Sequence, residues 1–240
     1  MKKRIQRWTV AWSILFCAVL GGCFSEIVTV DDYEFVHKSP QGCSDTVDYY
    51  VYSYIGGETE LTIPLEYDGH SIVGLGEEGS PVNDDFGLSS VVKKLTIQKN
   101  IRYVAPNISW RRYLGDPTQN ELMLEEICVA EDNEYFKSIE GVLFSKDGSK
   151  ILLYPPAKLG DFYVVPESAT TGSLLGNKNL KSIYIPSHRL VQLGLDAGVE
   201  NIFVPESLVE RYKELYLSYS PFYREEAFQP LPENWEDLVR

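Results

Sequence analysis

The feature that most constrains this chain is a short pattern that recurs from Leu61 to Pro205: an apolar residue, a variable residue and a second apolar residue. Alternate residues of a β-strand point to opposite faces, so both apolar positions of each copy would face a core. The six copies read LTIP, LTIQ, ICVA, YVVP, IYIP and IFVP. Four of them end in proline, which lacks a backbone N–H and ends a strand. We therefore expect these segments to be the parallel rungs of one continuous ladder.

The spacing of the segments indicates the type of repeat. The residues that follow the last apolar position are Pro64, Gln98, Ala130, Pro166, Pro186 and Pro205, so the steps between them are 34, 32, 36, 20 and 19 residues. The last two steps match a single leucine-rich repeat, whose period is about 20–29 residues, and the longer steps imply insertions. The sequence therefore predicts a mainly β fold with some α, a leucine-rich-repeat solenoid of about six rungs.

Two β-hairpins are expected beside the rungs. Residues 33–37 and 48–54 are rich in strand-forming side chains and predict an N-terminal hairpin that covers the apolar face of the first rung. Asp147-Gly148 lies between two apolar runs, 140–145 and 150–155, which is a strong signal for a tight hairpin turn. This second hairpin is inserted between the ICVA and YVVP segments, and we expect it to protrude from the solenoid.

The C-terminal section is expected to form a helical cap. Glu206 and Ser207 follow Pro205 and suit the first turn of a helix. One face of that helix would carry four apolar or aromatic residues at helical spacing. They are Leu208, Tyr212, Leu215 and Tyr216. Ser220-Pro221 would end the helix, residues 225–231 would return as a short strand or extended segment, and residues 233–240 would form a tail.

The N-terminal sequence predicts that the protein is exported from the cytoplasm. A basic segment, MKKRIQRW, precedes the apolar run Val10–Leu20, which suits a signal peptide and is too short to span a bilayer. Leu20-Gly21-Gly22-Cys23 then resembles a bacterial lipobox, in which Cys23 is lipidated and becomes the new N-terminus. We therefore assign residues 1–22 to a lipoprotein signal peptide, 23–32 to a tether and 33–232 to the repeat domain with its caps. An ordinary signal peptide and a retained membrane helix are the alternatives.

Charge and cysteine content narrow the partners. The formal charge is −13, and loss of Lys2, Lys3, Arg4 and Arg7 with the signal peptide would take it to −17. Such an acidic surface repels phosphate backbones and argues against nucleic-acid binding. Lipidation of Cys23 would leave Cys43 and Cys128, which could form one disulfide in an oxidising compartment or stay free.

Three segments resemble the BspA-like leucine-rich-repeat surface proteins of bacteria. Residues 133–148 (NEYFKSIEGVLFSKDG) are similar to that family's inserted hairpin, Ile63-Pro64 with 67–76 to its first repeat, and 201–207 with Tyr212-Lys213 to its last rung and closing helix. The resemblance covers about Tyr33 to Pro230. The family's A-F-x-x-C pattern is replaced here, for example by Asp85-Phe86 and Ser89, so the repeats are divergent. Membership would imply surface exposure and, in some members, adhesion, with no shared catalytic residues.

No motif in the chain indicates catalysis. The acidic pairs, such as Asp84-Asp85, are typical of a solvated surface and do not supply the ligand pattern of a calcium loop. The histidines are scattered without metal-ligand spacing, and no nucleophile elbow, phosphate loop or HExxH motif occurs. The three histidines are His37, His70 and His188. We therefore expect no enzyme activity, no metal and no cofactor, and a hydrolase is the least favoured alternative.

The outward positions of the rungs provide the candidate site. If the apolar pattern faces the core, the central residues of the rungs point outward; they are Thr62, Thr96, Cys128, Val164, Tyr184 and Phe203. The outward positions two residues earlier are Glu60, Lys94, Glu126, Phe162, Ser182 and Asn201. The row changes from polar to aromatic towards the C-terminus. Phe162, Val164, Tyr184 and Phe203 would form one exposed ligand-binding patch, unless the closing helix or the hairpin covers them.

The sequence thus predicts a lipid-anchored protein exposed outside the cytoplasm. We expect it to bind an extracellular or envelope protein or a glycan, in adhesion or a related interaction, and to meet the membrane through its N-terminal lipid. A structural or assembly component of the cell envelope is the alternative function. The sequence does not specify an oligomeric state.

Overall fold

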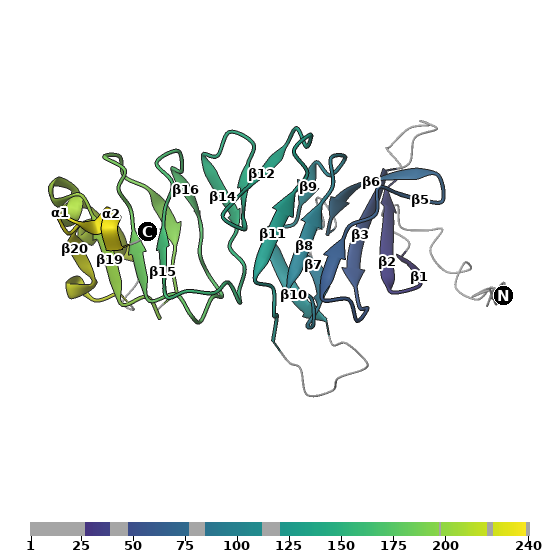
Figure 1. The fold of residues 1–240 in the computed structure, drawn as a ribbon, viewed down its shortest axis with the longest axis horizontal. Helices are drawn as coiled ribbons and strands as arrows, with labels where there is room; N and C mark the ends of the chain where they lie inside the picture. The colour runs from purple at the N-terminus through teal and green to yellow at the C-terminus, as the bar shows by residue number, and fades with distance from the viewer. Residues whose placement is uncertain are drawn as a thin grey trace, which may run out of the picture.

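The fold is mostly β with few helices. The computed structural model describes residues 27–38, 48–76, 85–111, 121–196, 198–219 and 223–238. Figure 1 shows short strands placed one after another along the long axis, from the N-terminal strands at one end to the C-terminal helices at the other. Cys23, Cys43 and the Ser220-Pro221 break lie outside the described residues, so the predictions made for them stay predictions.

An antiparallel sheet forms the N-terminal end. It contains β1 (Ile27–Val30), β2 (Tyr33–Lys38) and β3 (Asp48–Tyr54). The β2–β3 pairing, with Tyr33 opposite Tyr54, confirms the predicted pair of strands. Strand β1 lies within the segment assigned to a tether, and its pairing with β2 shows that regular structure begins earlier than expected. The residues of β1 are all β-branched, which favours a strand, and Val28 and Val30 are half-buried while Ile27 and Thr29 are exposed.

Parallel strands continue from this sheet. Strand β3 pairs in parallel with both β6 (His70–Leu75) and β7 (Asp85–Ser89), which places the first parallel layer directly on the hairpin. Three short strands complete this region: β5 (Glu66–Tyr67), β9 (Tyr103–Val104) and β10 (Asn107–Arg111). β5 pairs antiparallel with β6, while β9 pairs with β6 and β10 with β7 in parallel.

The first three predicted rungs form one parallel sheet, here called the first ladder. Its strands are β4 (Glu60–Thr62), β8 (Lys94–Ile97) and β11 (Glu126–Val129). Leu61, Leu95 and Ile127 are aligned across the three strands and are buried. The predicted register of the apolar positions is therefore confirmed for these strands.

The last three predicted rungs form a separate sheet, the second ladder. Its strands are β15 (Phe162–Val164), β17 (Ser182–Tyr184), β19 (Asn201–Val204) and β20 (Phe228–Pro230). All of them pair in parallel, and Tyr163, Ile183 and Ile202 are aligned and buried. β20 is the returning segment expected at 225–231. The expectation of one continuous ladder was wrong, because β11 and β15 belong to different sheets.

The inserted hairpin separates the two ladders. β12 (Phe136–Ile139), β13 (Val142–Ser145) and β14 (Lys150–Leu153) pair antiparallel, and β14 continues in parallel into β16 (Thr171–Ser173) and β18 (Gln192–Gly194). The predicted turn is present, with Gly148 at a φ of 79°. The expectation that the hairpin protrudes was wrong, because Val142, Leu143, Phe144 and Ile151 are fully buried and β14 joins a five-stranded sheet.

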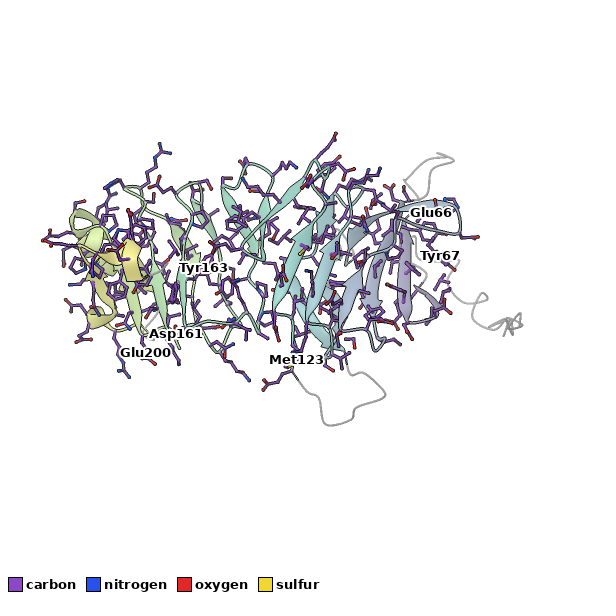
Figure 2. The ribbon with its side chains drawn as sticks, viewed as in Figure 1. Glu66, Tyr67, Met123, Asp161, Tyr163 and Glu200 are labelled. Carbon is purple, nitrogen blue, oxygen red and sulfur yellow. The ribbon has the colours of Figure 1, made fainter. Side chains whose placement is uncertain are left out.

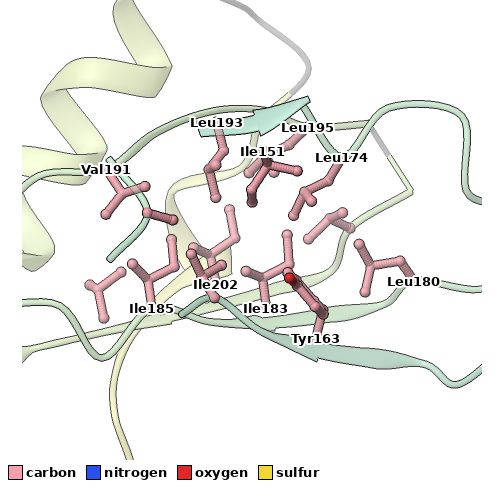
Figure 3. Packing of buried hydrophobic residues seen from close by; sticks show 14 of the residues in the cluster. Ile151, Tyr163, Leu174, Leu180, Ile183, Ile185, Val191, Leu193, Leu195 and Ile202 are labelled. Carbon is pink, nitrogen blue, oxygen red and sulfur yellow. The ribbon is translucent and has the colours of Figure 1, made fainter. Parts of the chain in front are cut away.

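Two hydrophobic cores meet at β13. Alternate residues of this strand enter different cores: Leu143 packs in the N-terminal core with Leu124 and Ile127, and Val142 packs in the C-terminal core with Ile151. Figure 3 shows the C-terminal core, where Ile183, Ile202 and Tyr163 from the second ladder face Ile151 and Leu193 from the opposite sheet. A strand that is apolar on both faces is buried on both, which explains why β13 lies inside the molecule.

Two buried asparagines connect successive turns of the chain. In each, the side-chain nitrogen donates to two backbone carbonyls of an earlier turn, and the side-chain oxygen accepts from two N–H groups just downstream. Asn133 donates to Gln98 and Ile101 and accepts from Tyr135 and Phe136. Asn177 donates to Pro155 and Lys158 and accepts from Asn179 and Leu180. All eight distances are 2.8–3.1 Å. These bonds satisfy backbone groups where the chain leaves the strands.

The predicted helix after Pro205 is confirmed. It comprises the 3-10 turn η1 (Glu206–Leu208) and α1 (Val209–Tyr219). Leu208, Tyr212 and Tyr216 are buried against the C-terminal core, as their spacing predicts. A second 3-10 turn, η2 (Glu225–Ala227), precedes β20, and α2 (Trp235–Leu238) lies in the segment expected to be a tail. None of the helices described here is long and apolar enough to cross a membrane.

Candidate functional site

The outer face of the second ladder carries the four residues predicted to bind a ligand. Their neighbours Tyr163, Ile183 and Ile202 belong to the C-terminal core, so the side chains at the intervening positions point away from it. Val164, Tyr184 and Phe203 are aligned on adjacent strands, and Phe162 lies two residues before Val164. The structure therefore brings the four predicted residues together on one face.

Three of these residues form a continuous aromatic cluster. The Tyr184 ring stacks on Phe203, with centroids 4.7 Å apart, and meets Phe162 edge to face at 6.2 Å. Both are favourable geometries for aromatic pairs, because the positive edge of one ring meets the negative face of another or the rings are offset. The cluster is fixed by the register of the parallel strands, so it is a preformed surface.

Trp235 extends this cluster and was missed by the sequence prediction. Its ring lies 6.5 Å from Tyr184 with an interplanar angle of 25°, on the outer side of the ladder. Tyr184 is consequently only 9% exposed, whereas Phe162 is 39% exposed and Phe203 is half-buried. The predicted exposure was therefore wrong for Tyr184. The covering element is neither α1 nor the inserted hairpin but the short segment that contains α2.

Polar side chains lie beside the aromatic cluster on the same face. Ser182 and Asn201 are aligned with Phe162, while Gln229 on β20 is aligned with Phe203. The Asn201 side chain donates to the Ser182 hydroxyl at 3.3 Å and accepts from the Gln229 side chain at 3.1 Å. Serine, asparagine and glutamine thus form a hydrogen-bonded row that crosses three strands. Gln229 was not predicted, because its strand was not recognised as a rung.

The outer face of the first ladder is different. Glu60, Lys94 and Glu126 are aligned across the strands, and the Lys94 and Glu126 side chains form an ion pair at 3.4 Å. The Cys128 thiol donates to Glu126 at 3.2 Å. Burial raises the pKa of this free thiol, and the Glu126 carboxylate raises it further. The thiol is therefore not an activated nucleophile, because a reactive cysteine needs a lowered pKa.

A cavity of about 710 Å³ lies between the segments that carry the two cores. Its lining includes Met123 from the N-terminal part and Leu159 and Leu175 from the C-terminal part, and the two leucines are 72% and 52% exposed. Glu121 and Lys178 form an ion pair at its edge. Figure 2 shows Met123, Asp161 and Glu200 along the same long edge of the molecule, where β11, β15 and β19 begin.

Among the described residues, neither the outer faces of the two ladders nor the cavity carries a catalytic arrangement. Apart from the shift of Asp147 in the hairpin turn, the large pKa shifts belong to tyrosines in or beside the two cores: burial raises the pKa of Tyr33 and of Tyr154 to about 12. Such groups stay protonated at neutral pH. Within the described part of the chain, no group of three or more His, Cys, Asp or Glu side chains is arranged to hold a metal ion.

Comparison with known proteins gives remote structural likenesses. No family model and no curated protein matches the chain. Three solved structures align with it. A leucine-rich repeat protein from Eubacterium ventriosum is 12% identical, with 73% of this chain and 71% of that chain covered and a TM-score of 0.31. The pneumococcal vaccine antigen PcpA is 13% identical (78% of this chain and 68% of that chain covered, TM-score 0.24), and a leucine-rich cell surface protein from Faecalibacterium prausnitzii is 12% identical (77% of this chain and 80% of that chain covered, TM-score 0.24). TM-scores this low do not establish a common fold.

Proposed function

We propose that this chain is a lipid-anchored bacterial surface protein that binds a protein or glycan through the outer face of its second ladder. The observation that supports this most directly is the aromatic cluster of Phe162, Tyr184 and Phe203, which lies outside both hydrophobic cores. Aromatic side chains contribute much of the energy of binding interfaces, and an aromatic patch on a regular sheet is a common interaction site. Core packing therefore does not explain why the outer face of the second ladder is aromatic.

The proposal includes the architecture of a leucine-rich-repeat solenoid with about six rungs and caps at both ends. Its support is the aligned parallel pairing within each ladder and the two asparagines that connect successive turns. In such a fold every rung contributes one strand to a broad face, so the rungs differ mainly in their outward residues. The first ladder presents an ion pair, while the second presents aromatic rings.

The proposed export and lipid anchoring rest on the N-terminal sequence. A basic segment, an apolar run and Gly21-Gly22-Cys23 support export and lipidation of Cys23. We expect metabolic labelling with a radioactive fatty acid to mark the wild-type chain in a bacterial host, and Cys23→Ser to abolish the label. Cys128→Ser is the matched control and should keep it. Labelling that persists in Cys23→Ser would disprove the anchor.

Binding can be tested with cells that display the full-length chain. The probes are immobilised fibronectin, collagen and mucin, which represent extracellular proteins and glycans. Phe162→Ala and Phe203→Ala should each weaken capture of a bound probe by about tenfold, or about 1.4 kcal/mol, because each removes a ring from the cluster. Thr62→Ala and Thr96→Ala change aligned positions on the first ladder and should have no effect. Equal binding by all four variants would show that the second ladder is not the site.

The cavity beside Leu159 and Leu175 favours a second role, as an assembly component of the cell envelope. Two strongly exposed leucines next to an apolar cavity are typical of a surface that another protein covers. A photo-crosslinking amino acid at Leu175 should then trap one defined envelope protein in intact cells. The same amino acid at Thr62 is the control. Absence of a specific product at Leu175 would argue against this role.

A further inference from the structure

The chemistry of the second ladder indicates which class of ligand it suits. Two aromatic rings border the accessible part of its outer face: Phe162, which is 39% exposed, and Trp235, which is half-buried. Both rings lie beside Tyr184, Phe162 edge to face at 6.2 Å and Trp235 stacked at 6.5 Å, so their positions are fixed by it. An aromatic ring face is electron-rich and attracts weakly positive C–H groups. A pyranose ring presents such C–H groups on its flat faces.

The hydrogen-bonded row provides directed polar contacts next to these rings. A primary amide has two N–H donors and an oxygen with two acceptor positions. The bonds of Asn201 to Ser182 and to Gln229 use one donor and one acceptor position of its amide. Among the described residues no other partner uses its second donor or its second acceptor position, so one of each remains for a ligand at a side chain whose orientation is already fixed. Paired donors and acceptors match adjacent sugar hydroxyls, each of which both donates and accepts.

The face is uncharged at its centre. The aligned side chains of the two outward rows are Phe162, Ser182, Asn201, Val164, Tyr184, Phe203 and Gln229. None is an acid or a base that is charged at neutral pH. On the adjoining turns, Lys181 and Glu200 form an ion pair with each other at 3.4 Å, and the charged neighbours of Phe162 and Trp235 in the sequence are acids: Asp161, Glu236 and Asp237. A chain with a formal charge of −13 also repels anionic polysaccharides.

We infer that the ligand of this face is a neutral glycan, with one sugar ring stacked on Phe162 or Trp235 and its hydroxyls bonded to Asn201 and Gln229. This inference rests on the proposed binding function of the same face and gives that function its ligand class. Trp235 already stacks on Tyr184, and a sugar stacked on Phe162 or on Trp235 would bury that ring further. A charged glycan would gain no ion pair at the centre of the face.

The test uses the full-length protein in mild detergent and isothermal titration calorimetry. The neutral probes are soluble oligosaccharides of glucose, N-acetylglucosamine and mannose; the anionic probes are hyaluronan and heparin fragments of similar length. At least one neutral probe should bind with a measurable affinity, and the anionic probes should not. Preferential binding of an anionic probe, or no binding of any neutral probe, would overturn the inference.

Variants localise the contact. Phe162→Ala and Asn201→Ala should each weaken binding of the neutral probe by about tenfold or more, or about 1.4 kcal/mol. Ser182→Ala offers a milder change to the polar row if Asn201→Ala fails to fold, and it should weaken binding several-fold. Lys181→Ala, in the neighbouring ion pair, is the matched control and should bind as the wild type does. Unchanged binding by folded Phe162→Ala would place the sugar elsewhere and disprove the site.

Trp235 provides a direct optical signal. Addition of the neutral probe should shift or quench the tryptophan fluorescence of the wild-type protein, and the change should disappear in Trp235→Phe. A change that persists in Trp235→Phe would exclude contact at this face. The two proposals can be told apart. Capture of fibronectin or collagen that depends on Phe162, without binding of any sugar, would retain the binding function and disprove the glycan class. If neither a protein probe nor a sugar binds in a way that depends on Phe162, both the binding function and the glycan class are disproved.

Discussion

The Tyr216 hydroxyl makes two hydrogen bonds to the backbone of Leu193: it accepts from the N–H and donates to the carbonyl, both at 2.9 Å. Leu193 lies in β18, the last strand of its sheet, so these groups would otherwise be unpaired. Tyr212 accepts from Val191, and Tyr223 donates to Leu195. Side chains from the C-terminal segment thus replace the next strand and close the sheet edge, which is otherwise a site of aggregation.

Tyr216→Phe should lower the free energy of unfolding by about 1–3 kcal/mol, because it leaves a buried N–H and a buried carbonyl of Leu193 without a partner. The ring and its packing are retained, so the loss reports the hydroxyl alone. Urea unfolding followed by circular dichroism measures the change. Tyr135→Phe is the control, since Tyr135 is 47% exposed, and it should unfold like the wild type. Equal stability of both variants would contradict the edge-closing role.

Asn133→Ala should destabilise the protein by about 2–3 kcal/mol, because it removes partners from two carbonyls and two N–H groups around a buried side chain. Asn133→Asp retains an oxygen for the N–H groups but loses the amide hydrogens, so it should be destabilising as well. The exposed Asn107 provides the control, and Asn107→Ala should stay within about 0.5 kcal/mol of the wild type. Chemical unfolding of the three variants tests whether the bonds of Asn133 connect the turns.

The inward positions of the ladders could be predicted because strand alternation leaves little choice. A shift of one residue would place Ile183 and Ile202 in solvent, so the apolar pattern fixes both the face and the register. The aromatic patch followed from the same alternation. The break between β11 and β15 could not be predicted in this way. It arises because β13 is apolar on both faces and is buried between two cores. That burial depends on a sheet in which the neighbouring β14 pairs with β16, and β16 with β18, further along the chain.

The coverage of the patch was also beyond a pattern-based prediction. Trp235 belongs to a helix of four residues, which is too short to show periodicity. Its contact with Tyr184 joins positions 51 residues apart and leaves no local signal. Asn133 was overlooked for a similar reason. An asparagine after a strand is typical of any turn, and its role depends on carbonyls at Gln98 and Ile101 in an earlier turn.

The turn of the inserted hairpin should make stability depend on pH at the acidic end. Hydrogen bonds from the Ser145 hydroxyl and from the N–H and hydroxyl of Ser149 lower the pKa of Asp147 from 3.8 to about 2. A lowered pKa in the folded state stabilises the fold above the unfolded pKa, and this contribution is lost as the pH falls through about 2. The stability difference between the wild type and Asp147→Ala should therefore shrink between pH 4 and 2. A difference that is independent of pH would contradict this.

Tyr163→Phe should have the opposite effect to Tyr216→Phe. Tyr163 is buried in the C-terminal core, and among the described residues its hydroxyl has no hydrogen-bond partner. Burial strongly raises the pKa of this hydroxyl, which shows how poorly the site would tolerate a charge. An unpaired buried hydroxyl costs about 1–3 kcal/mol, so its removal should leave stability unchanged or increase it by about 1 kcal/mol.

The two phenylalanine variants form a matched pair, because each deletes one oxygen from a buried ring of the same core. If hydroxyl pairing determines the sign, urea unfolding should place Tyr163→Phe at or above the wild-type midpoint and Tyr216→Phe below it. The difference cannot come from ring packing, which both variants retain. A loss of stability in Tyr163→Phe as large as that in Tyr216→Phe would show that the Tyr163 hydroxyl is paired in solution, for instance to a buried water molecule.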